Sequence, residues 1–422
     1  MASFERILVT PPVVFYVAPE SPFPARCGNA LRDSQQIYIL GGMGFSVRLL
    51  AIRRRLDLEQ PEERFLPPGV EVAYARPSSR GSESMVETLW RKLTYVLWSR
   101  RHAFSWWTES YRPDKFLMDE VRRLRPDVIL IRSIFMHTLP LLRRFYDGTI
   151  IVDCHDADIH LACEAFRSVQ WWRRLGPWAN LIAVRRSCRA YLPLADEVWA
   201  VSEEDAERIC RDAQPRKVVV VPNGMPDPED ATPRPGHGSS TILVANYGYG
   251  PNTNGARWLV EKVWPLVIQR IPDAHLELIG ANMPSSLQVR CHTVPGVVVR
   301  GAVTDLEPVY ERSAVVAVPV LEGSGTRLKI VDAWRHGKAV VTTSKGIEGL
   351  DAPQGAAIVA DTPGRFADGL VEAMASAEIR SALGLSGLQH MRVRLAWSGI
   401  ASHVTSRSVL ASLVQRRCQR SC

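Results

Sequence analysis

The stretch Ala314–Leu350 reads AVVAVPVLEGSGTRLKIVDAWRHGKAVVTTSKGIEGL, and it decides which fold the chain can adopt. Its first part, Ala314–Val320, is an apolar, β-branched run that is typical of a buried strand in a parallel sheet. A glycine-containing turn follows, and apolar residues then recur at helical spacing over Thr326–His336. We expect Gly337 to end this helix in the left-handed conformation and Ala339–Thr343 to form the next buried strand. The stretch therefore predicts a βαβ unit.

The turn of this unit is suited to a phosphate group. Gly323, Ser324 and Gly325 allow close approach of the backbone, and the free N–H groups at a helix start favour an anion. Arg327 and Lys329 add two cations that can form charge-assisted hydrogen bonds. A plain crossover whose helix shows a solvated basic face would carry the same residues, so spacing alone leaves both interpretations open.

This window resembles the C-terminal donor-site signature of the family 4 glycosyltransferases. In that family a strand runs into a Gly-x-Gly-Thr-Arg-Leu-Lys turn, which is followed by an acidic helix position, Gly-Lys and Thr-x-x-Gly-x-Glu-Gly. The resemblance implies the GT-B fold, in which two doubly wound, Rossmann-like domains face a central cleft. It also implies a retaining, metal-independent transfer of a sugar from a nucleotide diphosphate sugar to an acceptor. The matching residues are Gly323, Gly325, Thr326, Arg327, Leu328, Lys329, Gly337, Lys338, Thr343, Gly346, Glu348 and Gly349.

Composition agrees with a soluble protein of two domains, since 422 residues exceed what one core usually supports. The net charge of +8 indicates an anionic partner, and a nucleotide diphosphate, a membrane surface and nucleic acid would all qualify. The resemblance selects the nucleotide diphosphate, so we expect no nucleic acid partner. No Cys-x-x-Cys pair, secretory start or long apolar run is visible, which predicts reduced thiols and a cytoplasmic protein.

The predicted strands form two successive βα arrays. We expect residues 1–224 to form the N-terminal, acceptor-side domain, and the stretch 225–240, rich in proline, glycine and charge, to be the linker. Residues 241–395 are predicted to form the nucleotide-sugar-binding domain. By resemblance, residues 396–422 form a C-terminal helix that crosses back to the first domain.

Two residues of the N-terminal half are assigned to the site by resemblance. Gly28 fits the family's Pro-x-x-Gly-Gly loop, which faces the donor diphosphate, while Asn29 departs from its second glycine. His155 follows a predicted strand, where family members often carry a histidine near the donor sugar. Asp156 and Asp158 also spell the Asp-x-Asp of metal-dependent enzymes, but the rest of the chain matches a fold that needs no metal. We therefore predict no metal site and no cofactor.

The acidic positions depart from the family pattern. Many members use one glutamate near the transferred sugar and another on the ribose. Asp332 occupies the second place with a shorter carboxylate, while Ser324 falls at the first and Glu322 lies two residues before it. Either Glu322 takes the acidic role at the sugar or that role is absent. We predict His155 and Glu322 as catalytic residues, and as donor-binding residues Gly28, Asn246, Gly280, Gly323, Ser324, Gly325, Thr326, Arg327, Lys329, Asp332 and Glu348.

The segment 89–107 mixes tryptophans with arginines and a lysine. Such a composition suits the headgroup layer of an anionic membrane, and it equally suits a helix that packs its tryptophans into its own domain. Peripheral membrane contact through 89–107 is thus one of two interpretations.

Two other functions share the predicted fold. A nucleotide-sugar 2-epimerase would convert the donor alone, and a non-catalytic protein would only bind it. A nicotinamide oxidoreductase is disfavoured, because no Gly-x-Gly-x-x-Gly follows the first strand.

Overall fold

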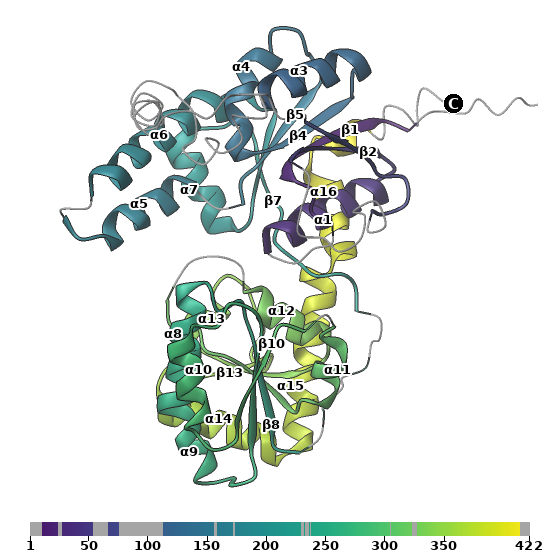
Figure 1. The fold of residues 1–422 in the computed structure, drawn as a ribbon. Helices are drawn as coiled ribbons and strands as arrows, with labels where there is room; N and C mark the ends of the chain where they lie inside the picture. Colours follow the sequence, from purple (N-terminus) through teal and green to yellow (C-terminus); the bar gives the residue numbers. More distant parts are fainter. Residues whose placement is uncertain are drawn as a thin grey trace, which may run out of the picture. The chain divides into compact units, whose positions relative to one another are not determined.

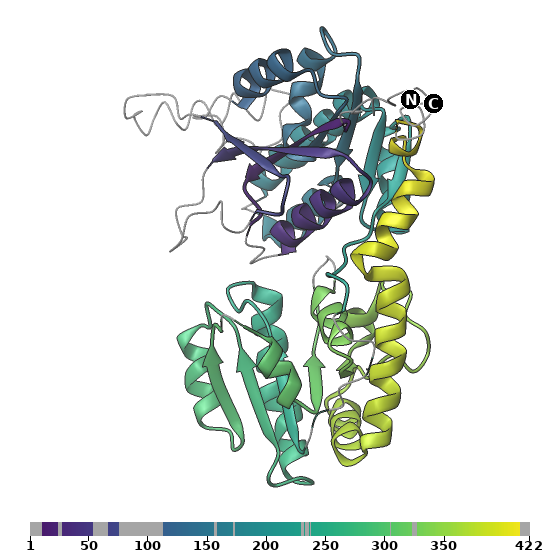
Figure 2. The same ribbon diagram turned by 90° about the vertical axis from the view of Figure 1, so that its right-hand side faces the viewer.

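The computed structural model describes residues 11–23, 28–53, 66–75, 113–155, 158–171, 174–228, 232, 236, 238–303, 305–322 and 327–413. The chain divides into two compact units, the first made of Met1–Pro222 with Ile400–Cys422 and the second of Asn223–Gly399. Each unit contains one parallel sheet with helices around it (Figures 1 and 2). Two doubly wound, Rossmann-like units were predicted, and this fold class is confirmed.

The sheet of the first unit has the strand order β3-β2-β1-β4-β5-β6-β7, and every adjacent pair is parallel. Its central strands are apolar along their length, because helices cover both faces of the sheet. The strands are β1 (Val13–Glu20), β2 (Ser46–Arg53), β3 (Glu71–Tyr74), β4 (Val128–Arg132), β5 (Thr149–Asp153), β6 (Glu197–Ala200) and β7 (Val218–Val220).

Two hydrophobic clusters cover the faces of this sheet. One cluster receives side chains from α3 (Pro113–Leu124), α5 (Asp158–Ser168), α6 (Leu175–Tyr191) and α7 (Glu203–Ala213). The other receives them from α1 (Gly28–Gly42) and α16 (Trp397–Arg407). The C-terminal residues Ile400, Val404 and Leu410 are thus part of the core of the first unit. Shorter helices are η3 (Ser133–Thr138), α4 (Leu139–Leu142) and η5 (Leu192–Leu194).

The second unit repeats this plan with the order β10-β9-β8-β11-β12-β13, again wholly parallel. The strands are β8 (Ser240–Val244), β9 (His275–Ile279), β10 (Val297–Gly301), β11 (Val315–Val318), β12 (Ala339–Thr342) and β13 (Ile358–Val359). The helices are α8 (Gly250–Trp258), η6 (Leu259–Val263), α9 (Trp264–Ile268), α10 (Ser285–His292), α11 (Glu307–Arg312), α12 (Leu328–Arg335), α13 (Ser344–Ile347), α14 (Pro363–Ala375), α15 (Ala377–His390) and η7 (Met391–Leu395).

The βαβ unit that opened the sequence analysis is present as β11, α12 and β12. Gly337 has a φ of +63° directly after the helix end, so the predicted left-handed cap is confirmed. Ser202 is the N-cap of α7, and its hydroxyl accepts a hydrogen bond from the Asp205 N–H at 3.1 Å.

One element prediction is wrong. The apolar spacing of residues 366–385 predicts one continuous helix, but α14 ends at Ala375 and α15 begins at Ala377. Ser376 breaks the helix with an extended backbone, and its hydroxyl caps α15 by accepting from the Ile379 N–H at 3.1 Å. A short polar residue that can cap is enough to separate two helices whose apolar spacing looks continuous.

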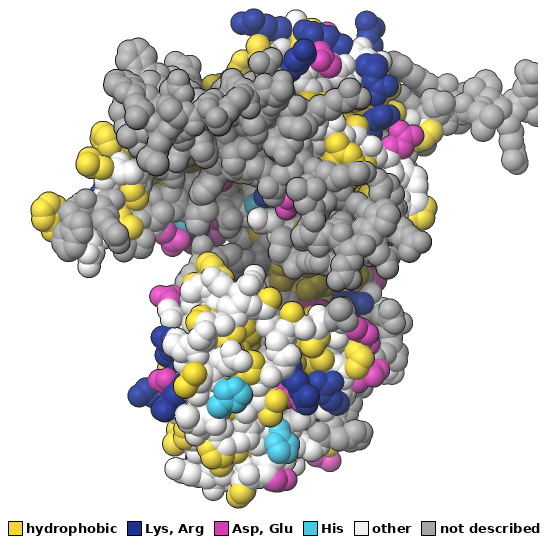
Figure 3. Space-filling model, in the orientation of Figure 1, with side chains coloured by type: hydrophobic (Ala, Val, Ile, Leu, Met, Phe, Trp, Pro, Cys, Tyr) yellow, Lys and Arg dark blue, Asp and Glu magenta, His cyan; other side chains and the backbone are white. Residues whose placement is uncertain are grey.

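Among the helices that the structure describes, none is long and apolar enough to cross a membrane. The surface drawn in Figure 3 shows basic, acidic and hydrophobic side chains interspersed over the second unit.

Candidate functional site

In both units the strand order reverses at one point. The reversal lies between β1 and β4 in the first sheet and between β8 and β11 in the second. Ligands of open parallel sheets bind beyond the carboxyl ends of the strands at such a point. The connections that follow the two adjacent strands there run to opposite faces of the sheet and leave a crevice between them. Most of the predicted site residues that the structure describes follow strands at or next to these two positions.

In the first unit a buried ion pair joins α1 to β5. Arg32 and Asp153 have side chains that are only 1% and 0% exposed. The Arg32 Nε lies 3.2 and 3.1 Å from the two carboxylate oxygens, and Nη1 donates to the Val221 carbonyl at 2.7 Å. This guanidinium holds the pKa of Asp153 well below its usual range, against the opposing effect of burial. The Arg32 side chain therefore connects the start of α1 to the carboxyl ends of β5 and β7.

A second ion pair lies beside the first. Arg132, the last residue of β4, places Nη1 3.4 Å from Asp33 of α1. The Tyr16 hydroxyl donates to Asp33 Oδ1 at 2.7 Å. Despite full burial, the nearby Arg132 and His155 lower the pKa of Asp33. We call Arg32, Asp33, Arg132, Asp153 and His155 the arginine–aspartate cluster.

His155 is oriented by this cluster. Arg132 Nη2 lies 3.0 Å from His155 Nδ1, and Asn29 Oδ1 lies 3.2 Å from the same ring nitrogen. Nε2 then faces Asp153 Oδ2 at 2.9 Å and Asp33 Oδ1 at 3.2 Å. The side chain is 10% exposed, so one edge of the ring is presented to solvent. Contacts at both ring nitrogens fix the plane of the ring.

Asp33, Asp153 and His155 have donor atoms within 4.8 Å of one another, as a metal site would require. However, Asp153 already pairs with Arg32 and Asp33 with Arg132, and Arg132 also contacts His155 Nδ1. Two positive charges balance the two negative ones, so a divalent cation would add repulsion instead of replacing water. These residues do not fit a metal site.

The second unit gathers cations beyond β11. The Arg327 side chain is 9% exposed; its Nε donates to the Lys345 carbonyl at 3.0 Å, and Nη2 lies 3.5 Å from Glu348. Lys329 Nζ donates to Asn252 Oδ1 at 2.6 Å, which uses one of its three N–H donors. Burial, and then the charge of Arg327, lower the pKa of Lys329 to about 8. We call Arg327, Lys329, Lys345 and Glu348 the basic turn.

Asp332 is engaged within its own unit. Its Oδ2 accepts a hydrogen bond from the Tyr310 hydroxyl at 2.9 Å, and Oδ1 lies 3.5 Å from His336 Nε2. The Tyr310 and His336 rings are stacked at 4.1 Å, and His336 Nδ1 lies 3.1 Å from Glu307. Tyr310 therefore fixes the direction of the carboxylate that was predicted to meet the ribose.

Other predicted residues of this unit also follow strand ends. Glu322 Oε1 accepts from Asn254 Nδ2 at 2.6 Å. Asn246 Oδ1 accepts from the Gly248 N–H at 3.0 Å and from Asn282 at 3.1 Å. Gly280 has a φ of +139°, and a Cβ there would lie 1.7 Å from the Ala245 carbonyl oxygen, so only glycine fits.

Part of the prediction lies outside the described residues. These positions are Gly323, Ser324, Gly325, Thr326, Asp156 and the segment 89–107. Gly28 is the first residue of α1, beside the arginine–aspartate cluster.

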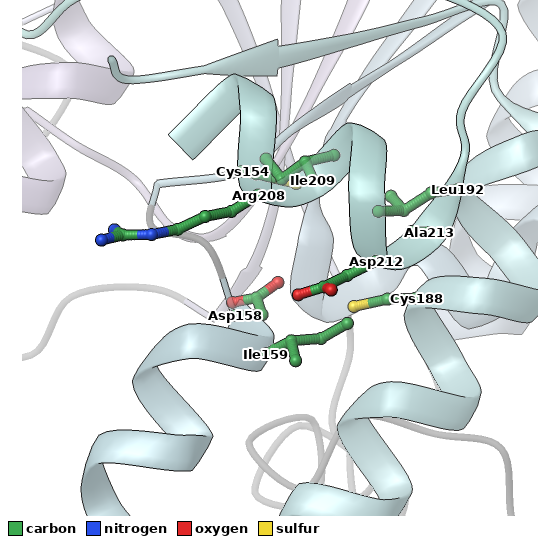
Figure 4. A pocket seen from close by; sticks show the side chains of 9 residues that line it. All are labelled: Cys154, Asp158, Ile159, Cys188, Leu192, Arg208, Ile209, Asp212 and Ala213. Carbon is green, nitrogen blue, oxygen red and sulfur yellow. The ribbon is translucent and has the colours of Figure 1, made fainter. Parts of the chain in front are cut away.

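The first unit also contains a small cavity, which is lined by no residue of the arginine–aspartate cluster or of the basic turn. It lies between α5, α6 and α7 and has room for about one water molecule, far too little for a nucleotide. Figure 4 shows Asp158 and Asp212 with their carboxylates turned toward each other across it. Burial raises the pKa of the adjacent Cys154 and Cys188 thiols, which makes them poor nucleophiles. Asp158, half of the Asp-x-Asp pattern, thus lines this cavity.

The sequence did not predict three residues of the arginine–aspartate cluster, nor Asn252, which binds Lys329 of the basic turn. The three cluster residues are Arg32, Asp33 and Arg132. Each is a charged residue at a position where its helix or strand is otherwise buried, and this pattern could have indicated a buried ion pair. Asn252, which holds Lys329, had no such signal, because the two residues are 77 positions apart.

Comparison with known proteins identifies the family. A family model described as "Glycosyl transferases group 1" matches residues 239–376, and one described as "Glycosyltransferase Family 4" matches residues 43–227. The chain belongs to the group 1 glycosyltransferases of the family 4 type. The chain is thus a transferase, and the resemblance read from Ala314–Leu350 is confirmed.

Solved glycosyltransferase structures share the fold over nearly the whole chain. Sucrose-phosphate synthase from Thermosynechococcus elongatus has a TM-score of 0.63 at 14% identity and covers 95% of this chain and 100% of its own. Anabaena HepE, in complex with UDP and glucose, has a TM-score of 0.60 at 12% identity and covers 96% of this chain and 100% of its own. WaaG, a glycosyltransferase involved in lipopolysaccharide biosynthesis, has a TM-score of 0.61 at 11% identity, with 94% and 100% covered.

A curated relative is an uncharacterized 44.6 kDa protein in the cps region of Klebsiella pneumoniae. It is 27% identical over 130 residues, which are 29% of this chain and 34% of the relative. The match thus spans about a third of the relative's length.

Removal of only one partner of the Arg32–Asp153 pair should destabilise the protein strongly. Arg32→Leu should lower the free energy of unfolding by about 3–5 kcal/mol at neutral pH, because it leaves a buried carboxylate without its partner. The loss should shrink at acid pH, where the orphaned carboxylate becomes protonated. Urea unfolding at both pH values measures this.

Two variants serve as controls for that measurement. Arg32→Leu combined with Asp153→Leu should cost less than the two single changes added together. Arg48→Leu, which breaks a pair with the exposed Glu71, should cost about 1 kcal/mol or less. Equal losses for Arg32→Leu and Arg48→Leu would show that the buried pair has no special weight.

Proposed function

We propose that this glycosyltransferase moves a sugar from a nucleoside diphosphate sugar to an acceptor, with retention of anomeric configuration and without a divalent cation. The basic turn carries the proposal. Arg327 and Lys329 are cations held largely out of water at the carboxyl end of β11, next to the reversal of strand order. A diphosphate bound there would restore the interactions that burial removes from both cations.

The basic turn also has a catalytic task in this proposal. Negative charge develops on the leaving diphosphate as the bond to the sugar breaks. Arg327 is held by Lys345 and Glu348 and Lys329 by Asn252, so both cations are positioned before the reaction begins. Donors that are fixed in advance stabilise the transition state without reorganisation.

Uridine diphosphate is the first donor class to test. Anabaena HepE was solved with UDP and with UDP-glucose, and TarM of S. aureus with UDP. These ligands belong to those proteins, and they guide only the choice of probe. Asp332, fixed by Tyr310, is the proposed acceptor of hydrogen bonds from the ribose hydroxyls.

A glycan is the first acceptor class to test. WaaG takes part in lipopolysaccharide biosynthesis, and the Klebsiella relative is named for the cps region. His155, which Arg132 contacts, and Glu322 remain the proposed catalytic residues. Retention of configuration follows from the family resemblance and is checked by NMR of the anomeric proton in the product.

Loss of either cation should weaken nucleotide binding. Arg327→Ala and Lys329→Ala should each raise the dissociation constant for UDP by about tenfold to a hundredfold, since a charge-assisted bond contributes roughly 1.5–3 kcal/mol. Isothermal titration calorimetry measures the change. Lys262→Ala, an exposed lysine on η6, is the matched control and should bind UDP like the parent. Unchanged affinity in both site variants would remove the basic turn from the donor site.

Turnover should not require a metal. UDP-sugars are incubated with glycan acceptors in the presence of excess EDTA, and UDP release should continue at the rate seen without EDTA. Activity that disappears and returns with manganese would contradict metal independence. A change of the donor sugar without any acceptor would indicate the 2-epimerase, and binding without turnover the non-catalytic alternative.

A further inference from the structure

Helices α5 and α6 form a hairpin that extends beyond the body of the first unit. The two helices pack against each other, and Figure 1 shows them projecting side by side from the sheet. Buried residues such as Ile159 on α5 and Leu181 and Cys188 on α6 belong to the hydrophobic core, and the partly buried Phe166 packs against it. Among the described residues, the hairpin beyond Phe166 contributes no side chain to this core.

This outer end exposes large apolar side chains. Trp171 is 75% exposed, Leu175 is 80% exposed and Trp178 is 48% exposed. Figure 3 shows hydrophobic side chains at the end of the projection. Tryptophan and leucine at this level of exposure cost free energy in water unless a partner covers them.

The apolar tip continues into a basic stripe. Leu175, Trp178 and Ile182 recur at helical spacing on α6, and the exposed Arg185 and Arg186 follow one turn further. Residues 158–191 contain six arginines against two carboxylates in the sequence. The surface is thus apolar at its end and positively charged behind it.

We propose that this surface, defined as the apolar tip Trp171, Leu175 and Trp178 with the basic stripe Arg185 and Arg186, docks the protein on an anionic lipid bilayer. Tryptophan is favoured at the interface between water and hydrocarbon, and each arginine is attracted to anionic headgroups. A second copy of the chain is a poorer occupant, because a symmetric contact would bring the arginines of both copies together. This surface contains no residue of the arginine–aspartate cluster and none of the basic turn.

Flotation of the full chain with lipid vesicles tests this. The parent should float with vesicles of equal parts phosphatidylethanolamine and phosphatidylglycerol, and stay in the soluble fraction with phosphatidylcholine alone. Trp171→Ser/Leu175→Ser/Trp178→Ser should weaken binding about tenfold or more, since affinity scales with the apolar area inserted. Arg185→Gln/Arg186→Gln should weaken it by about fivefold for each arginine, and added salt should do the same to the parent.

Matched controls separate this surface from general effects of charge and hydrophobicity. Arg122→Gln/Arg123→Gln removes two exposed arginines from α3, and Val289→Ser/Val393→Ser removes exposed apolar side chains from the second unit. Both should float like the parent, and circular dichroism should confirm that all variants are folded. A parent that does not float, or tip and stripe variants that float like the parent, would overturn the proposal. A tip variant that instead reduces the molar mass in solution would assign the tip to a second copy of the chain.

Discussion

The buried ion pair between Arg32 and Asp153 is the constraint on which the first unit depends. A guanidinium and a carboxylate are stable away from water only when each meets the other with good geometry. Here the pair joins the first turns of α1 to the end of β5, and a third bond reaches Val221 after β7. His155 comes two residues after Asp153, so the same pair fixes the position of the side chain proposed to act in catalysis.

The second unit has the same order of strands, but its charged residues are arranged differently. Its reversal of strand order, between β8 and β11, is flanked by cations that are only partly balanced by Glu348. Positive charge held out of water weakens the native state, as the low pKa of Lys329 indicates. A bound diphosphate would remove that cost. The arginine–aspartate cluster is balanced internally, whereas the basic turn is completed by an anionic ligand in our proposal.

The sequence predicts the strands Val315–Val318 and Ala339–Thr342, because fully buried parallel strands appear as short apolar runs. It fails where one polar residue decides, as at Ser376, which splits a helix that apolar spacing makes continuous. It also cannot pair charges across the fold. Arg32 and Asp153 are 121 positions apart, and only the completed sheet brings them together. The glycosyltransferase signature around Arg327 was predictable, because its residues are contiguous.

Proton uptake on binding of UDP is the sharpest test of a diphosphate site at Lys329. If a diphosphate binds against Lys329, the pKa of that lysine must rise from about 8, and the complex must take up about half a proton at pH 8. Calorimetry in buffers of different ionisation enthalpy measures this uptake. We expect proton uptake in the parent and its loss in Lys329→Arg, whose charge does not titrate in this range. Binding without proton uptake, or uptake that persists in Lys329→Arg, would contradict a diphosphate site at Lys329.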